Sequence, residues 1–409
     1  MPQIKSFRAV RPTPELAAQV ASVPYDVVNR AEAAQLAEGN EHSFLHVVRP
    51  DIDLPADTDP YANEVYSTAR GHLDRLRSEG ILVQDDSESL FVYRQTMNGQ
   101  SQTGVVCCCH VDDYENNLIL KHEKTRPAKE DDRTRHVVTL NAHAGPIFLT
   151  YRDIPDVNTQ VAAITAQPPL YDFVAADGVG HTVWQVTDCA NLIAAMSASP
   201  AFYVADGHHR AASAWRAAQQ RAAQNPNHTG TEEYNWFLTV LFPAGELTIL
   251  PYNRIIADLN GHTPDDIRAK LSELGVLEPA GEHQPQMSGR FAIYLDGGWW
   301  QLTLPADSID AADPIESLDV ALLERRILEP IFGITDVRRD PRIDFVGGIR
   351  GTKELERRVD SGDWACAVSM YATTIDQLMS VADAGEVMPP KSTWFEPKLR
   401  SGLLVHLLD

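Results

Sequence analysis

The chain has 409 residues, 44% of them hydrophobic and 22% charged, and its formal net charge at pH 7 is -22. A chain of this length usually forms two or three domains, and its composition is that of a folded protein rather than a disordered one. Because so acidic a surface repels a phosphodiester backbone, we expect no nucleic-acid binding. A small anionic ligand would have to be held by a local group of basic side chains.

The cysteines do not follow the CxxC spacing of a zinc or redox site. They are Cys107, Cys108, Cys109, Cys189 and Cys366. Three consecutive cysteines in an apolar run are typical of small buried residues in a strand, and an odd count favours reduced thiols and the cytoplasm. No apolar run approaches the ~20 residues that span a bilayer, and the N-terminus has no apolar secretory segment. We therefore expect a cytoplasmic protein without membrane contact.

The first half of the chain predicts both strands and helices. In chain order, they are a strand over 7–12, an amphipathic helix over 61–76, strands over 90–93 and 104–111 joined across Asn98-Gly99, a helix entered at Pro127, and strands over 146–150 and 201–205. The helix is predicted by apolar residues at helical spacing, and Asn-Gly between two strands is a strong hairpin signal.

The second half continues the same alternation. An alanine-rich helix over 211–223 stops at Asn225-Pro226, strands follow over 237–242 and 291–295, and a helix over 318–329 is expected to end at Pro330. The mixture predicts an α/β (α+β) fold. We expect an N-terminal α/β domain over 1–230 and a C-terminal α/β domain over 231–409, whose segment 388–404 returns to the active-site cleft.

A first candidate site is the segment DGHHR at 206–210, between a predicted strand and a predicted helix. Gly207 lets a ligand approach the backbone, and the N-terminus of the helix favours an anion. Arg210 could bind phosphate oxygens through two N–H groups, while Asp206 could orient a partner or activate a hydroxyl. Of His208 and His209, one is expected to contact phosphate and the other to pack. The alternative is an ordinary helix start capped by Asp206.

A second candidate is the basic segment 120–127, a local reversal of the chain's acidity. Lys121, His122 and Arg126 would line a positively charged side of a phosphate-binding cleft. Glu123 would be a candidate general base. The alternative is a solvated, charged turn.

Two further segments complete the set. Lys391, Ser392, Thr393 and Lys398 lie among prolines and aromatic residues and could bind phosphate; the alternative is a packed C-terminal strand. Near the N-terminus, the apolar run VPYDVV at 23–28 contains Tyr25 and Asp26, which are candidates for substrate contact. A turn carboxylate is the commoner role for such an aspartate. No set of metal ligands is predicted, and no P-loop, Rossmann, HExxH or GxSxG motif is present.

These four segments, in this order and over nearly the whole chain, resemble the domain-of-unknown-function family 1015. The matching motifs are PYDV at 24–27, HExT at 122–125, ADGHHR at 205–210 and the segment 388–404. The third motif is also distantly similar to the phosphate-binding signature of the ParB/sulfiredoxin-like superfamily, which includes free-serine kinases that use ADP or ATP. Ala211 departs from the tyrosine that family 1015 often has at this position.

The resemblance implies a ParB/sulfiredoxin-like nucleotide-binding core with an additional α/β domain. It points to Asp206 and His209 as active-site residues, and to Glu123, or else Asp26, as the counterpart of an upstream glutamate in the kinases. The leading hypothesis is a nucleotide-dependent phosphotransferase acting on a small hydroxylated metabolite, with serine as one acceptor, ATP or ADP as cofactor and Mg²⁺ as a further candidate. The alternatives are a phosphoester hydrolase of the phosphoserine type and a non-catalytic, nucleotide-regulated ParB-like binding protein. The partner would be a small phosphate compound, and the sequence leaves homo-oligomer formation open.

Overall fold

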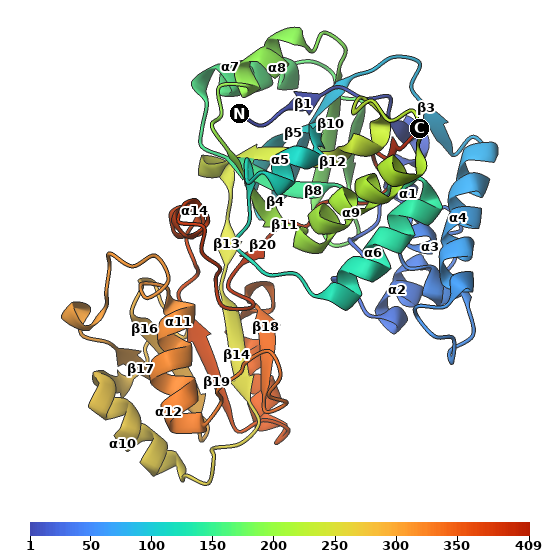
Figure 1. Cartoon of the computed structure of the whole chain (residues 1–409). Helices are drawn as coiled ribbons and strands as arrows, with labels where there is room; N and C mark the ends of the chain where they lie inside the picture. The colour runs from blue at the N-terminus through green and yellow to red at the C-terminus, as the bar shows by residue number, and fades with distance from the viewer. The chain divides into compact units, whose positions relative to one another are not determined.

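The computed structural model describes all 409 residues, and its internal contacts divide the chain into two compact units. Unit 1 comprises Met1–Leu247 and Pro397–Asp409, and unit 2 comprises Thr248–Glu396 (Figure 1). The expected boundary after residue 230 therefore falls inside unit 1. The last residues of the chain, red in Figure 1, lie among the elements of unit 1, where Val405 pairs with Val10.

Unit 1 is built on a nine-stranded mixed sheet. Its strand order is β6-β11-β8-β12-β5-β4-β10-β9, with β1 paired to β5. The strands are β1 (Ile4–Lys5), β4 (Leu90–Met97), β5 (Gln100–His110), β6 (Ile119–Leu120), β8 (Ile147–Tyr151), β9 (Tyr171–Val174), β10 (Gly180–Val186), β11 (Phe202–Asp206) and β12 (Trp236–Pro243). Strands β4 and β5 form the expected hairpin, in which Asn98 and Gly99 both have positive φ, as a type I′ turn requires. The three consecutive cysteines lie in β5 and are fully buried, as predicted.

The helices of unit 1 pack around this sheet. They are α1 (Ala17–Val20), α2 (Arg30–Ala37), α3 (Leu45–Val48), α4 (Asn63–Ser78), α5 (Val111–Glu115), α6 (Pro127–Leu140), α7 (Pro155–Thr165), α8 (Ala190–Met196) and α9 (His208–Gln224), with 3₁₀ turns η1 (Pro14–Leu16), η2 (Pro50–Asp53), η3 (Glu233–Asn235) and η4 (Ala244–Glu246). Figure 1 shows α6 beside α9, and Ser213 Oγ of α9 donates to Glu130 O of α6 at 3.2 Å. Small buried residues such as Ala211 and Ala214 let α9 pack closely in the core of unit 1.

Short strand pairs complete unit 1 and include the returning C-terminus. They are β2 (Val10–Pro12) with β3 (Leu82–Gln84), and β7 (Ala142–His143) with β21 (His406–Leu407). The predicted strand over 7–12 is correct only in its second half. Phe7 makes just an isolated bridge with Ser89.

Unit 2 contains a six-stranded sheet of order β15-β17-β16-β19-β14-β18 and a separate pair, β13 with β20. The strands are β13 (Ile249–Leu250), β14 (Tyr252–Ile256), β15 (Val276–Pro279), β16 (Arg290–Leu295), β17 (Gly298–Thr303), β18 (Ile343–Gly347), β19 (Cys366–Met370) and β20 (Trp394–Phe395). The helices are α10 (Pro264–Leu274), η5 (Ala306–Ser308), α11 (Asp319–Leu323), the π-helical turn η6 (Glu324–Leu328), α12 (Glu329–Phe332), η7 (Gly348–Arg350), α13 (Gly351–Asp360) and α14 (Ile375–Asp383).

One helix end in unit 2 differs from the sequence prediction. Pro330 does not end the helix; it lies in the first turn of α12, directly after the π-helical turn, and the helix ends at Gly333, whose φ is 66°. Leu328 and Glu329 keep right-handed helical backbone angles, so the helix continues through Pro330, and the π-helical turn just before it accommodates the missing proline N–H.

The predicted fold class is confirmed, because both units combine β-sheets with helices. No helix combines the length and the apolar character that crossing a membrane would require.

Candidate phosphate-binding site

Two strands of unit 1 explain why segments 120–127 and 206–210 come together. Strand β6 pairs in parallel with β11, with Phe202 opposite Ile119 and Tyr203 opposite Leu120. Parallel neighbours end at the same edge of a sheet, so the residues that follow each strand emerge side by side. At this edge the rings of His122 and His208 meet with their centroids 4.5 Å apart and their planes perpendicular.

Gly207 forms the turn between β11 and α9. Its φ of 96° and ψ of 31° place it in the left-handed region, which an L side chain rarely adopts. A Cβ at this position would also lie 3.1–3.2 Å from the guanidinium of Arg210. Glycine therefore serves two purposes here: it permits the turn, and it leaves room for an arginine folded back over the start of the helix.

Asp206 is an ionised carboxylate held between two cations. Its Oδ2 lies 3.4 Å from Lys398 Nζ and 3.8 Å from Arg210 Nη2, and its Oδ1 accepts the N–H of Gly207 at 3.0 Å. Burial alone would raise the pKa of Asp206, but Lys398 and Arg210 outweigh burial and hold that pKa well below its usual range. Such a carboxylate is better suited to positioning cations than to accepting a proton.

Arg210 lines a small cavity of unit 1. The guanidinium is anchored by Nη1, which donates to the carbonyl oxygen of Pro146. The cavity has a volume of about 40 Å³. Its polar lining comes from Tyr25, Arg133, His136, His143, Arg210 and Ser401. At ~10–15 Å³ for each water, the space suits one phosphoryl-sized group and not a whole nucleotide.

A second arginine faces the same cavity from α6. The guanidinium carbon of Arg133 lies 4.2 Å from the ring centroid of Tyr25, and Nη2 pairs with Asp132 Oδ2 at 2.9 Å. Burial, together with the charge of Asp26, raises the pKa of Tyr25, so its phenol stays a neutral hydroxyl at ordinary pH. Neither Arg133 nor Ser401 was among the predicted site residues. Arg133 follows the basic segment 120–127 in α6, and its position on that helix turns it toward the cavity.

His209 is the more exposed of the two adjacent histidines of α9. Its Nε2 accepts the backbone N–H of Arg126 at 3.1 Å, so in the neutral ring the proton is on Nδ1. Burial lowers the pKa of His209, while the negative charges of Glu123 and Asp26 oppose that effect. The charges of Asp26 and Glu123, which come from two distant segments, therefore both act on the imidazole of His209.

His122 and His208 lie in the core rather than on the surface. Their exposed fractions are 1% and 6%. Burial lowers the pKa of His122 to about 3 and that of His208 to about 4, so both rings are neutral near pH 7. Two buried polar atoms at the start of α9 have no hydrogen-bond partner, namely His208 Nε2 and Arg210 Nε.

The remaining predicted basic residues of unit 1 differ in environment. Lys121 Nζ lies 4.0 Å from the ring centroid of Tyr114, and burial lowers its pKa. Arg126 is exposed at the N-terminal end of α6. Lys398 is directed to Asp206, as described above, and its own carbonyl oxygen accepts from Gln95 Nε2 at 2.9 Å.

Three predicted phosphate contacts belong to unit 2. Lys391 Nζ lies 5.4 Å from the ring centroid of Tyr252, Ser392 Oγ donates to Pro389 O at 2.6 Å, and Thr393 is the residue before β20. A role for Lys391, Ser392 and Thr393 in the site built on α9 stays a prediction.

Comparison with solved structures gives low similarity. A variant of free serine kinase in complex with AMP shares 12% identity, with 74% of this chain and 92% of that chain covered, at a TM-score of 0.36. SbnI from Staphylococcus aureus, with a C-terminal truncation, shares 10% identity over 74% of this chain and 87% of that chain, at a TM-score of 0.40. A conserved hypothetical protein from Pyrococcus furiosus shares 13% identity over 74% and 95%, at a TM-score of 0.34. Likenesses this weak indicate neither a ligand nor an activity for this chain.

Comparison with protein-family models gives a clearer result than comparison with solved structures. No curated protein matches the chain. The sequence matches the family described as "Protein of unknown function (DUF1015)" over residues 4–321, which is most of the chain. The match includes the segments 24–27, 122–125 and 205–210, which sequence analysis assigned to that family. The chain therefore belongs to the DUF1015 family.

Proposed function

We propose that the chain binds a phosphate-bearing nucleotide at the start of α9 and transfers a phosphoryl group to a small hydroxylated metabolite, such as free serine. The main support is a single observation: Arg210 and Arg133, from two different helices, line one small cavity beside the left-handed glycine that begins α9. In a chain of net charge -22, two arginines at one cavity are a marked local reversal of charge.

The unpaired polar atoms add support for an anionic ligand. Arg210 Nε is buried without a hydrogen-bond partner, although a buried N–H group usually has one. The guanidinium is held by Pro146 O and by the charge of Asp206, so its orientation is set in advance. A phosphate oxygen is a natural acceptor for the remaining N–H, because guanidinium and phosphate bind through charge-assisted hydrogen bonds.

The roles of the nearby groups follow from their protonation. Arg210 and Arg133 would hold the oxygens of the transferred phosphoryl group. The Nδ1–H of His209 could donate to charge that develops on it, because Nε2 already accepts from the backbone. Asp206, paired with Lys398, would keep the cations in place.

The transfer itself needs a proton acceptor. The acceptor hydroxyl oxygen would attack the terminal phosphorus, the bond between that phosphorus and the nucleotide would break, and the nucleotide would leave with the electron pair. The hydroxyl proton would pass to a carboxylate, for which Glu123 and Asp26, two of the acids whose charges act on His209, are the candidates. Adenine nucleotides, with or without Mg²⁺, are the first donors to test, as the sequence resemblance suggests.

The test is a direct assay of phosphoryl transfer. The full chain is incubated with ADP or ATP, with and without Mg²⁺, and with serine, threonine, homoserine or glycerol, and products are identified by phosphorus NMR and mass spectrometry. O-phosphoserine or another phosphorylated acceptor is expected. Conversion of phosphoserine to serine and phosphate would instead make the protein a phosphoester hydrolase. Tight nucleotide binding without any turnover would make it a nucleotide-regulated binding protein.

A further inference from the structure

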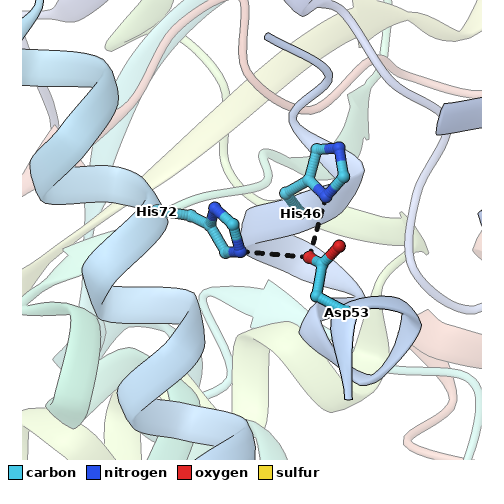
Figure 2. Close-up of side chains that lie close together, drawn as sticks. All are labelled: His46, Asp53 and His72. Atoms are coloured by element: carbon cyan, nitrogen blue, oxygen red, sulfur yellow. Dashed lines mark hydrogen bonds and ion pairs between the residues drawn. The ribbon is translucent and has the colours of Figure 1, made fainter. Parts of the chain in front are cut away.

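Three side chains of unit 1 that the proposed phosphotransfer site does not use converge on one point. They are His46 in α3, Asp53 at the end of η2 and His72 in α4 (Figure 2). The Nδ1 of His46 lies 2.8 Å from Asp53 Oδ2, and the Nε2 of His72 lies 3.0 Å from the same oxygen. We propose that these residues form a binding site for one divalent transition-metal ion, for which Zn²⁺ is the test ion.

The three donor atoms all lie within 4.8 Å of one another. In a tetrahedral zinc site with bonds of ~2.0–2.1 Å, neighbouring ligand atoms are about 3.4 Å apart. The two distances to Asp53 Oδ2 are shorter than that by about half an ångström, so a small outward movement of the side chains would admit the ion. Three protein ligands would leave a fourth position for water or another ligand.

The hydrogen bonds of His46 also favour a cation at this point. Its Nε2 lies 3.2 Å from the carbonyl oxygen of Asn40, which can only accept, so Nε2 must have a proton. In the neutral ring, the lone pair of Nδ1 would then face the carboxylate oxygen of Asp53, a repulsive contact. Either a second proton or a metal ion between the two atoms removes the repulsion. A metal-bound histidine that donates its other N–H to a backbone carbonyl is the usual arrangement in metalloproteins.

The exposure and the chemical type of the three ligands fit the same kind of ion. The side chains of His46, His72 and Asp53 are 15%, 24% and 29% exposed, so they are partly enclosed yet reachable from solvent. Two imidazoles and one carboxylate favour Zn²⁺ and other first-row transition metals over Mg²⁺ or Ca²⁺, which prefer oxygen ligands. The ion would link α4 to the adjoining elements α3 and η2.

The local sequence explains how the three side chains meet. Helix α3 ends at Arg49, whose φ is -133°, and Pro50 begins the short turn η2, so the chain folds back within seven residues of His46. Helix α4 packs through an apolar face that includes Leu73, and His72 adjoins that face at its edge. Asp53 and His72 are separated in sequence by a loop and the first half of α4, so no short sequence motif contains all three ligands.

The experiment uses the full chain, freed of metal with a chelator and titrated with Zn²⁺ alone by calorimetry. One equivalent is expected to bind, and an excess of Mg²⁺ is expected not to compete. His72→Gln and Asp53→Asn should each weaken this binding by at least about tenfold, because even changes behind the ligands cost 10–100-fold. His228→Gln is the matched control: His228 also contacts a carboxylate, Glu232 at 3.1 Å, but no second histidine.

A second measurement needs no variant. Co²⁺ added to the wild-type chain should broaden or shift the imidazole NMR signals of His46 and His72, and leave those of His228 unchanged. The proposal is overturned if the wild type shows no saturable binding at one equivalent, if His72→Gln and Asp53→Asn bind Zn²⁺ as the control does, or if Co²⁺ affects other histidines instead. Circular dichroism of each variant separates a loss of ligands from a loss of fold.

Discussion

Replacing Arg210 by alanine tests the proposed phosphate site most directly. The substitution removes the guanidinium that lines the cavity, donates to Pro146 O and lies 3.8 Å from Asp206 Oδ2. One anchoring hydrogen bond and one ion pair are lost, which should cost about 1–3 kcal/mol of stability. A protein stabilised by about 5–15 kcal/mol should remain folded.

The expected loss of affinity follows from the contacts that Arg210 can make. A guanidinium–phosphate contact is a charge-assisted hydrogen bond, of a kind that contributes about 1.5–3 kcal/mol. At about 1.4 kcal/mol for each factor of ten, Kd for a phosphate-bearing ligand should rise about 10- to 150-fold. Arg133 remains in the cavity of the variant, so binding should weaken rather than vanish.

The assay is calorimetric titration of the full chain with pyrophosphate and with ADP. Arg221→Ala is the control, because Arg221 lies on the same helix, donates to the side chain of Asn141 and does not line the cavity. Both variants remove one positive charge, so a non-specific electrostatic effect would appear in both. Equal Kd values for wild type and Arg210→Ala, or equal losses in Arg210→Ala and Arg221→Ala, would refute the assignment of Arg210 to the site.

Three other substitutions test the same physical reasoning. Gly207→Ala should lower the free energy of unfolding in urea by about 1–2 kcal/mol, because the backbone of Gly207 is left-handed. It should also weaken pyrophosphate binding, because the added Cβ would displace the guanidinium of Arg210; unchanged stability and affinity would contradict the close approach of Arg210 to Gly207. Asp206→Asn should lower turnover by ~10²-fold, and by more than it weakens pyrophosphate binding, because Asp206 positions Lys398 and Arg210 and small displacements cost more in the transition state than in binding; equal losses of turnover and affinity would count against this positioning role. Burial raises the pKa of Asp319 from 3.8 to about 6, so the folded state binds this proton more tightly, and unit 2 loses stability as the pH rises from about 4 to 6. In urea unfolding near pH 7, the free energy of unfolding of Asp319→Asn should be higher than that of wild type by about 3 kcal/mol, with no such gain at pH 4.

The local parts of the fold and of the candidate site could be predicted from sequence. The strand before Asp206, the helix after Gly207 and the Asn98-Gly99 hairpin all depend on short-range patterns: an apolar run, an alanine-rich segment and a two-residue turn. Such patterns act over a few residues, because backbone dihedrals and side-chain spacing decide them. The family assignment has the same origin, since three of the four short motifs that suggested it lie within the matched residues 4–321.

What only the tertiary structure decided is which distant residues meet. The parallel pairing of β6 with β11 brings Glu123 into the electrostatic range of His209, and the returning C-terminus brings Lys398 to Asp206 across 192 positions. Strand order is set by how whole sheets and helices bury their apolar faces together, and no local pattern records that outcome. For the same reason the sequence did not reveal Arg133 at the cavity, or His46 and His72 on one oxygen of Asp53.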